Sequence, residues 1–225
     1  RIRNAINLRE TAAPVNALKR DTVPGLYTRE VFFEKVEEMI AGREPGYYTL
    51  SSFDIDNFKV INDQYGTATG DAVLRHVARC IRDWVAPLGG LCCRVMADNF
   101  AVLYPSAYMN ALITERTHHE MTRPVALDRP INVCIGRCLV SDTALSASAL
   151  YDRATLAEAS IKGKYDTYVA QYDESMRSQL LYEQEIVNEM HAALTDGQFE
   201  LWFQPQFNHA TGALIGSEGL VRWRH

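Results

Sequence analysis

The sequence predicts an α/β sandwich, in which helices and strands are interleaved and pack in layers. Two observations support this fold class. Apolar residues recur at helical spacing in segments such as 29–41 and 146–162, and short apolar runs bounded by turn residues, such as 47–54, lie between them. With 225 residues, 47% of them hydrophobic and 23% charged, the chain has room for one large domain or for one domain and part of another.

The expected elements follow the chain in order. Thr28 is the expected N-cap of the first helix, after a Pro-Gly turn. Residues 1–20 have apolar residues among charged ones and are expected to be a connector from an upstream module. Helices are predicted at 29–41, after Gly70 as far as Val85, at 106–121 and at 146–162, and strands at 47–54, 91–95, 100–104, 131–140 and 165–172.

Composition excludes several classes of protein. The formal net charge is −5 and the basic residues are dispersed, so no nucleic-acid partner is expected. No apolar run approaches the roughly 20 residues needed to cross a bilayer, so this segment is expected to be cytoplasmic without membrane contact, although an anchor upstream is compatible with it. The five cysteines form no Cys-x-x-Cys pair and have no neighbouring histidines, which argues against zinc and disulfides.

One segment, 53–71, concentrates polar residues after a predicted strand. The apolar run leads directly into Asp54 and Asp56, and carboxylate oxygens suit a hard cation such as Mg²⁺, which leaves positions for substrate phosphates. Asn62 and Asp71 add a donor and acceptor set able to read a base edge. A Mg²⁺-nucleotide site is therefore the first hypothesis. The alternative is that the two acids cap a helix beginning near Asn57.

Three spaced motifs in residues 21–173 resemble a GGDEF domain, the diguanylate cyclase family of bacterial cyclic di-GMP signalling. They are Asp21-x-x-x-Gly-Leu-x-x-Arg, then Asp54-x-Asp-x-Phe-Lys-x-Ile-Asn-Asp-x-x-Gly with Gly70-Asp71, and Arg94-Val followed by a hairpin. The resemblance implies an α+β fold like that of nucleotide cyclases. Its central sheet is five-stranded and mostly antiparallel, with flanking helices.

The resemblance also implies site residues. Asp54 and the Ile55 carbonyl are expected to bind the metal, Mg²⁺ or Mn²⁺, with Asp98 added to this set. Asn62 and Asp71 are expected to hydrogen-bond the guanine of GTP or GDP, and Lys162 matches the family's phosphate-binding lysine. The implied chemistry joins two GTP molecules held by two facing domains, so a homodimer is expected.

The signature hairpin departs from the family pattern. Met96-Ala97-Asp98-Asn99-Phe100 stands where Gly-Gly-Asp/Glu-Glu-Phe is expected, and only Asp98 and Phe100 match. Met96 and Ala97 add side chains where glycines allow close approach of a nucleotide. Asn99 replaces a carboxylate with a neutral amide, which removes a charge and a proton acceptor. Cyclisation is expected to be very slow or absent, with no intact catalytic set.

Two further departures from the family pattern also argue against cyclase activity. Asp166 lies where an arginine is expected, and an acid there repels phosphate. Pro87 and Gly90 occupy the positions of the Arg-x-x-Asp product-inhibition motif. The alternative, given these departures, is that the domain has lost its ligand and that Asn62 and Asp71 cap and brace loops of the fold.

The tail changes in character. Residues 176–194 predict an amphipathic helix, and two strand-like runs follow on either side of a turn at 208–212. The tail resembles the start of an EAL domain, the cyclic di-GMP phosphodiesterase family with a TIM-type barrel, through Phe-Gln204-Pro and Gly-x-Glu218-Gly-Leu-x-Arg222-Trp, with Gly219 in place of the usual alanine. The resemblance makes Glu218 a metal ligand and places Gln204 and Arg222 against the dinucleotide. The alternative for Glu218 is an ordinary surface acid.

These observations predict four parts: a connector at 1–20, a degenerate GGDEF domain at 21–174, a linking helix at 175–198, and the first hairpin of a truncated EAL domain at 199–225. The expected function is regulation of an adjoining phosphodiesterase, with cyclic di-GMP bound by the complete EAL domain. This segment alone is expected to hydrolyse nothing, because the other barrel ligands would follow His225. The alternatives are a weakly active diguanylate cyclase and a dimerisation scaffold that binds no nucleotide.

Overall fold

The computed structural model describes residues 26–112, 114–164 and 166–224. The chain divides into two compact units, Arg1–Asp173 and Glu174–His225. The predicted connector at 1–20 and the motif beginning at Asp21 lie outside the described residues. The division between units falls one residue before the predicted end of the first domain.

The first unit contains a five-stranded sheet with the strand order β2-β3-β1-β4-β5. The central strand β1 is antiparallel to both β3 and β4, β2 is antiparallel to β3, and only β5 runs parallel to its neighbour β4. The predicted mostly antiparallel five-stranded sheet is thereby confirmed. The strands are β1 (Tyr48–Ile55), β2 (Leu91–Met96), β3 (Asn99–Pro105), β4 (Val133–Leu139) and β5 (Val169–Gln171).

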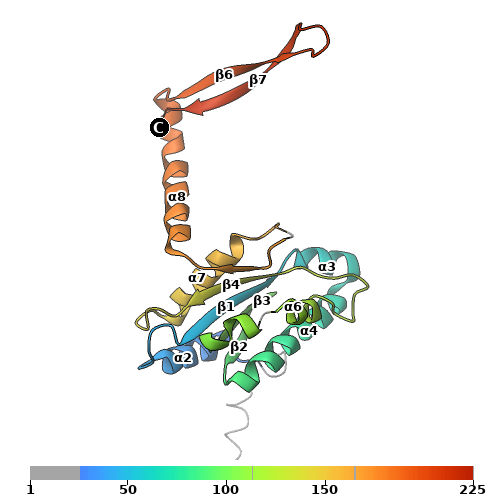
Figure 1. Ribbon diagram of the computed structural model, residues 1–225, viewed down its shortest axis with the longest axis vertical. Coiled ribbons are helices and arrows are strands. Elements are labelled where there is room, and N and C mark those ends of the chain that lie inside the picture. The colour runs from blue at the N-terminus through green and yellow to red at the C-terminus, as the bar shows by residue number, and fades with distance from the viewer. Residues whose placement is uncertain (1–25, 113, 165, 225) are drawn as a thin grey trace, which may run out of the picture. The chain divides into compact units, whose positions relative to one another are not determined.

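Helices cover both faces of this sheet, and each face has its own apolar core (Figure 1). Phe53 and Ile55 of β1 face the core beneath α4 (Thr67–Val85), whereas Tyr48 and Leu50 face the core beneath α2 (Arg29–Ile40) and α7 (Ala147–Ala159). Because side chains alternate along a strand, the polar residues Ser52 and Asp54 continue the second face. Asp54, the first residue of the predicted metal site, therefore lies on the sheet face that α7 covers.

The segment after β1 contains a short helix, α3 (Phe58–Tyr65), followed by α4. Asn57 is the N-cap of α3, with a left-handed φ of 57°, and makes no side-chain cap hydrogen bond. Asp54 lies within β1, and Asp56 accepts a bond from the Asn132 amide at 3.4 Å. The alternative in which Asp54 and Asp56 cap this helix is wrong, because Asn57 is the N-cap and the two carboxylates have other partners, Asn99 and Lys162 for Asp54 and Asn132 for Asp56.

Other element boundaries differ from the sequence prediction. The single helix expected at 106–121 is divided into a 3₁₀ turn η2 (Ser106–Tyr108), α5 (Met109–Leu112) and α6 (Glu115–Met121), because Thr114 and Thr117 form a capping box that starts a new helix. Another 3₁₀ turn, η1 (Ala86–Leu88), follows α4. The helix expected at 146–162 ends at Ala159, so Lys162 lies in the following turn. The expected last strand is reduced to β5.

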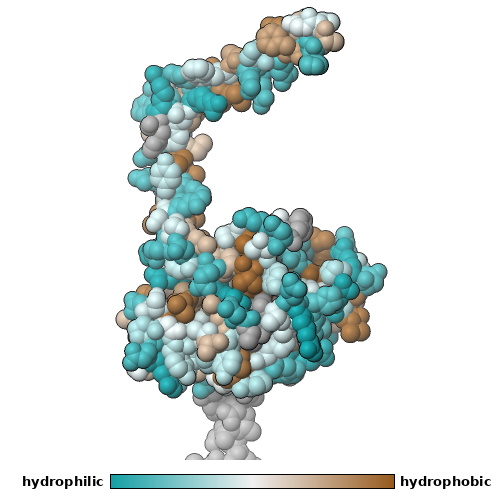
Figure 2. Space-filling model, in the orientation of Figure 1, coloured by the Kyte–Doolittle hydropathy of each residue, from teal (hydrophilic) through white to brown (hydrophobic). Residues whose placement is uncertain are grey.

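The second unit consists of α8 (Glu174–Thr195) and an antiparallel ribbon of β6 (Phe199–Phe207) and β7 (Leu214–Trp223). Large apolar side chains are exposed along the ribbon, which Figure 2 shows as brown surface; Phe203 is 65% exposed and Ile215 67%. The predicted helix and hairpin are present, while the TIM-type barrel remains a prediction. None of the described helices is both long and apolar enough to span a bilayer.

Candidate functional site

Asp54 is the centre of a buried polar cluster in the first unit. Asn99 lies directly opposite it in the pairing of β1 with β3, and the Asn99 Nδ2 donates a hydrogen bond to Asp54 Oδ1 at 2.7 Å. The Lys162 ammonium forms an ion pair with Asp54 Oδ2 at 2.9 Å. Both carboxylate oxygens of Asp54 therefore have partners from elsewhere in the chain.

Glu158 is a second buried acid in this cluster, and sequence reasoning did not select it. Its side chain is 4% exposed, and its Oε1 lies 3.4 Å from the Lys162 ammonium, one helical turn further along. Ser52 donates a hydrogen bond to its other oxygen. The available signal was the spacing of four residues between this acid and a lysine near the end of the predicted helix.

The cluster shifts the pKa values of its members. Burial raises the pKa of Glu158 to about 7, and the charge of Asp54 acts in the same direction, while Ser52 and Lys162 oppose the shift. Burial by itself would lower the pKa of Lys162, but the hydrogen bond and charge of Asp54, supported by Glu158, raise it above its ordinary value. Lys162 therefore stays charged between two acids.

The hairpin turn between β2 and β3, which contains Met96 to Asn99, lies next to this cluster. Ala97 has a φ of 48°, in the left-handed region that favours glycine, and its carbonyl accepts a hydrogen bond from the Arg94 guanidinium. Met96 is 71% exposed. Burial raises the pKa of Asp98, and the charge of Asp54 contributes, against the Asp98 backbone hydrogen bond and Lys162. The turn thus places an alanine in a backbone conformation that glycine adopts more readily.

The predicted guanine-binding residues lie on the two helices after β1. Asn62 is on α3, Asp71 is on α4, and Gly70 lies against the Asn62 amide, since a Cβ at position 70 would be 1.9 Å from Asn62 Oδ1. Within the described part of the chain, neither the Asn62 amide nor the Asp71 carboxylate makes a side-chain hydrogen bond. Their guanine-binding role remains a prediction.

The other predicted site residues of the first unit lie in β1, in β3 and in the turn between β2 and β3. Ile55 is the last residue of β1 and pairs with Val133 of β4, so its expected role as a carbonyl ligand remains a prediction. Phe100 is fully buried in the core on the α4 side. Asp98 has a raised pKa to which the Asp54 charge contributes, but no hydrogen bond between described side chains joins the two acids.

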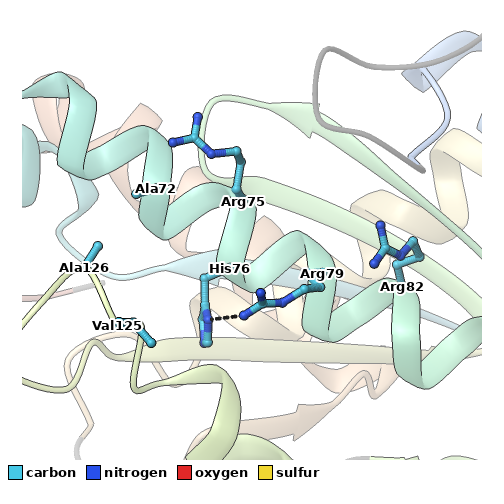
Figure 3. A pocket seen from close by; sticks show the side chains of 7 residues that line it. All are labelled: Ala72, Arg75, His76, Arg79, Arg82, Val125 and Ala126. Carbon is cyan, nitrogen blue, oxygen red and sulfur yellow. Dashed lines mark hydrogen bonds between the residues drawn. The ribbon is translucent and has the colours of Figure 1, made fainter.

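A hollow of about 580 Å³ lies along α4, the helix that covers the other face of the sheet (Figure 3). Arg75, Arg79 and Arg82 extend from α4 beside it, and the Arg79 guanidinium lies 3.2 Å from His76 Nδ1. The other His76 ring nitrogen, Nε2, is 3.0 Å from the Glu120 carbonyl oxygen. None of the predicted site residues lines this hollow, so it is separate from the Asp54 cluster.

The three residues predicted from the EAL resemblance all lie on the ribbon of the second unit. Gln204 pairs directly with Glu218, and Arg222 pairs with Glu200. Because these positions are separated by even numbers along each strand, Gln204, Glu218 and Arg222 lie on one face of the ribbon. Their predicted roles in metal and dinucleotide binding stay predictions.

A mixed five-stranded sheet with helices on both faces, and an acid at the end of its central strand, defines a domain of the nucleotide-cyclase type. The chain belongs to the GGDEF family, since the family described as "Diguanylate cyclase, GGDEF domain" matches residues 18–165. The resemblance inferred from the sequence motifs is thereby confirmed for this domain.

Similar proteins include longer chains. The chain is 27% identical over 218 residues to the bifunctional diguanylate cyclase/cyclic di-GMP phosphodiesterase MucR of Pseudomonas aeruginosa, covering 91% of this chain and 31% of MucR. It is 29% identical over 215 residues to the cyclic di-GMP phosphodiesterase NbdA of the same organism, covering 91% of this chain and 27% of NbdA. The chain thus spans about a third or less of these relatives.

Solved structures agree with the fold. The coiled coil and GGDEF domain of DgcB from Caulobacter crescentus, in complex with c-di-GMP, matches with a TM-score of 0.59 and 26% identity, covering 73% of this chain and 91% of that chain. The S helix-GGDEF-EAL structure of LapD from Vibrio cholerae matches with a TM-score of 0.61 and 14% identity, covering 96% of this chain and 52% of that chain. The second match concerns the fold alone.

Proposed function

We propose that residues 21–174 form a regulatory, catalytically degenerate GGDEF domain of a two-domain cyclic di-GMP signalling protein. The observation that carries the proposal is the hydrogen bond from the Asn99 amide to Asp54. A carboxylate at position 99 would share a cation with Asp54, whereas an amide donates its own hydrogen and leaves no second acid. The residue expected to support the reaction has become a structural partner.

The domain in this proposal still recognises GTP or GDP. Asn62 and Asp71 supply an amide and a carboxylate, which can pair with the amide edge and the amino group of guanine. Neither side chain has a hydrogen-bond partner among the described residues, which supports a role toward a ligand. The predicted phosphate contact by Lys162 requires its ammonium to leave Asp54, because the two are 2.9 Å apart.

The regulated partner in this proposal is an EAL phosphodiesterase that the second unit begins. Supporting observations are the shared face of Gln204, Glu218 and Arg222, the exposed apolar residues of the ribbon, and the similarity to MucR and NbdA, which are named as phosphodiesterases. The exposed residues suit burial against further barrel strands. In this proposal α8 links the two domains, and the GGDEF domain forms a homodimer that sets their orientation.

The test of nucleotide recognition is a calorimetric titration of the chain with GTP and with GDP. We expect binding that Asn62→Ala and Asp71→Ala each weaken at least tenfold, while Asn110→Ala, at an exposed asparagine of α5, leaves it unchanged. An absence of binding at millimolar nucleotide would overturn the nucleotide half of the proposal and favour the dimerisation scaffold.

A second candidate function is weak diguanylate cyclase activity, which the retained Asp98 beside the Asp54 cluster favours. The chain is incubated with GTP and Mg²⁺ or Mn²⁺, and cyclic di-GMP is measured by chromatography. The regulatory proposal expects no product above the background of the Asp54→Asn variant. Product that forms with the wild-type chain and is lost in Asp98→Asn would instead establish the cyclase.

A further inference from the structure

The Mg²⁺ that the family resemblance implies does not fit the Asp54 cluster as its residues lie. A metal ligand needs an oxygen lone pair facing the ion, but Asp54 Oδ1 faces the Asn99 amide at 2.7 Å and Oδ2 faces the Lys162 ammonium at 2.9 Å. Both partners present hydrogens, which repel a dication. Among the described residues, no group of three or more His, Cys, Asp and Glu side chains is arranged to hold a metal ion.

The position of Lys162 resembles that of a bound cation. Its Nζ lies between two carboxylates, 2.9 Å from Asp54 Oδ2 and 3.4 Å from Glu158 Oε1. Both acids are buried, at 8% and 4% side-chain exposure, so either one, when ionised, needs a compensating positive charge. Asp54 reaches the cluster from β1 and Glu158 from α7, so the ammonium joins a strand to a helix as a bridging ion would.

We propose that the Lys162 ammonium is the resident cation of this site, and that with the Asn99 amide it holds Asp54 in place of a divalent metal ion. The domain then binds no metal at Asp54 and presents Asn62 and Asp71 without one. This inference concerns the cluster alone and does not require nucleotide to bind.

A tethered ammonium has an advantage over a free ion. Lys162 is attached one helical turn after Glu158, so its effective concentration at the site is set by the chain, on the order of millimolar or above. A divalent ion must displace this ammonium, break the Asn99 hydrogen bond and lose part of its own hydration shell, which Mg²⁺ gives up reluctantly. The Lys162 side chain is 45% exposed, so the ion pair is partly screened and its replacement by mutation is practicable.

The experiment measures Mn²⁺ binding by electron paramagnetic resonance, without nucleotide. We expect the wild-type chain and Asp54→Asn to bind Mn²⁺ equally weakly up to 1 mM, on the order of the nonspecific affinity of surface acids. Lys162→Met should gain one site of at least tenfold higher affinity, which the double variant with Asp54→Asn loses. The matched control is Lys164→Met, an exposed lysine two residues away, which should gain no site.

Two results would overturn the inference. One is wild-type binding of Mn²⁺ at a site that Asp54→Asn removes, because the resident ammonium would then not exclude the metal. The other is a folded Lys162→Met variant without a new site. If that variant does not fold, the unfolding midpoint of the wild-type chain is measured in EDTA and in millimolar Mn²⁺. Mn²⁺ should shift the midpoint of the wild-type chain no more than it shifts the midpoint of Asp54→Asn. A larger shift for the wild-type chain overturns the inference. Failure of GTP binding leaves these readouts unaffected.

Discussion

Ser52 on the central strand donates a hydrogen bond to the buried carboxylate of Glu158 on α7, although the two residues are 106 positions apart in the chain. This contact gives the helix a polar attachment point on the sheet face that also presents Asp54. Glu158 also pairs with Lys162, which pairs with Asp54, so one chain of contacts runs from the sheet to the site.

The first prediction concerns pH. The pKa of the Glu158 carboxyl rises from its ordinary value of 4.5 to about 7 in the folded domain, so between these values the folded state holds a proton that the unfolded state has lost. Its contribution to stability is fully present below pH 4.5 and is lost as pH rises through 7, by roughly 3 kcal/mol at most. Glu158→Gln should therefore be increasingly stabilising, relative to wild type, from pH 5 to pH 8.

Chemical denaturation at several pH values measures this difference. Asp152→Asn, at an exposed acid on the same helix, is the control and should show a difference from wild type that does not change with pH. A Glu158→Gln difference that is equally flat would contradict the raised pKa.

The second prediction concerns the hairpin turn. Ala97 has a φ of 48°, a conformation that costs a residue with a Cβ about 1 kcal/mol relative to glycine. Ala97→Gly should therefore raise the free energy of unfolding by about 1 kcal/mol, measured in urea. Ala126→Gly, at an exposed loop alanine that lacks a positive φ, should instead be neutral or destabilising. Equal effects of the two changes would show that Ala97 is unstrained.

The third prediction tests the packing of the Asn62 side chain, on α3, against Gly70 of α4. A Cβ at position 70 would lie 1.9 Å from Asn62 Oδ1 and 3.0 Å from its Cγ, so Gly70→Ala must displace the amide. We expect a loss of about 1–3 kcal/mol despite the better helix propensity of alanine. In an Asn62→Ala background the same change should cost much less or stabilise, because the two closest contacts are removed and the next nearest, with the Phe58 ring, is at 3.2 Å. Additive effects in this double-mutant cycle would contradict the contact.

The fourth prediction concerns Gly136, which pairs with Ser52 across β1 and β4. A Cβ there would lie 1.9 Å from the Ala154 carbonyl oxygen and 2.5 Å from the Glu158 backbone nitrogen, so the clash is with backbone and cannot be relieved by a rotamer change. Gly136→Ala should destabilise the domain by about 3 kcal/mol or more, measured by thermal and chemical unfolding. Gly216→Ala, at a strand position where the nearest contact is 3.7 Å, is the control and should change stability by less than about 0.5 kcal/mol.

Local patterns in the sequence were sufficient for most of the first unit. The apolar run before Asp54 predicted the central strand, and the two runs around Met96–Asn99 predicted the hairpin, because strand periodicity and turn residues act over a few positions. The helix at 106–121 was predicted as one element because apolar spacing does not reveal the capping box at Thr114, which ends one helix and begins another. Boundaries set by such side-chain contacts are weakly encoded in periodicity.

The sequence by itself determined the family, the β2–β3 hairpin and the presence of an acid at the end of the central strand, since each depends on residue types at short spacing. Only the tertiary structure decided which groups that acid contacts. Asp54 meets Asn99 through strand register and Lys162 through the docking of α7, and Glu158 becomes a buried partner only because Gly136 lets the helix approach the sheet. Packing brings such residues together although they are far apart in the chain, by 106 positions for Ser52 and Glu158. The spacing of residues in the sequence therefore does not predict these contacts.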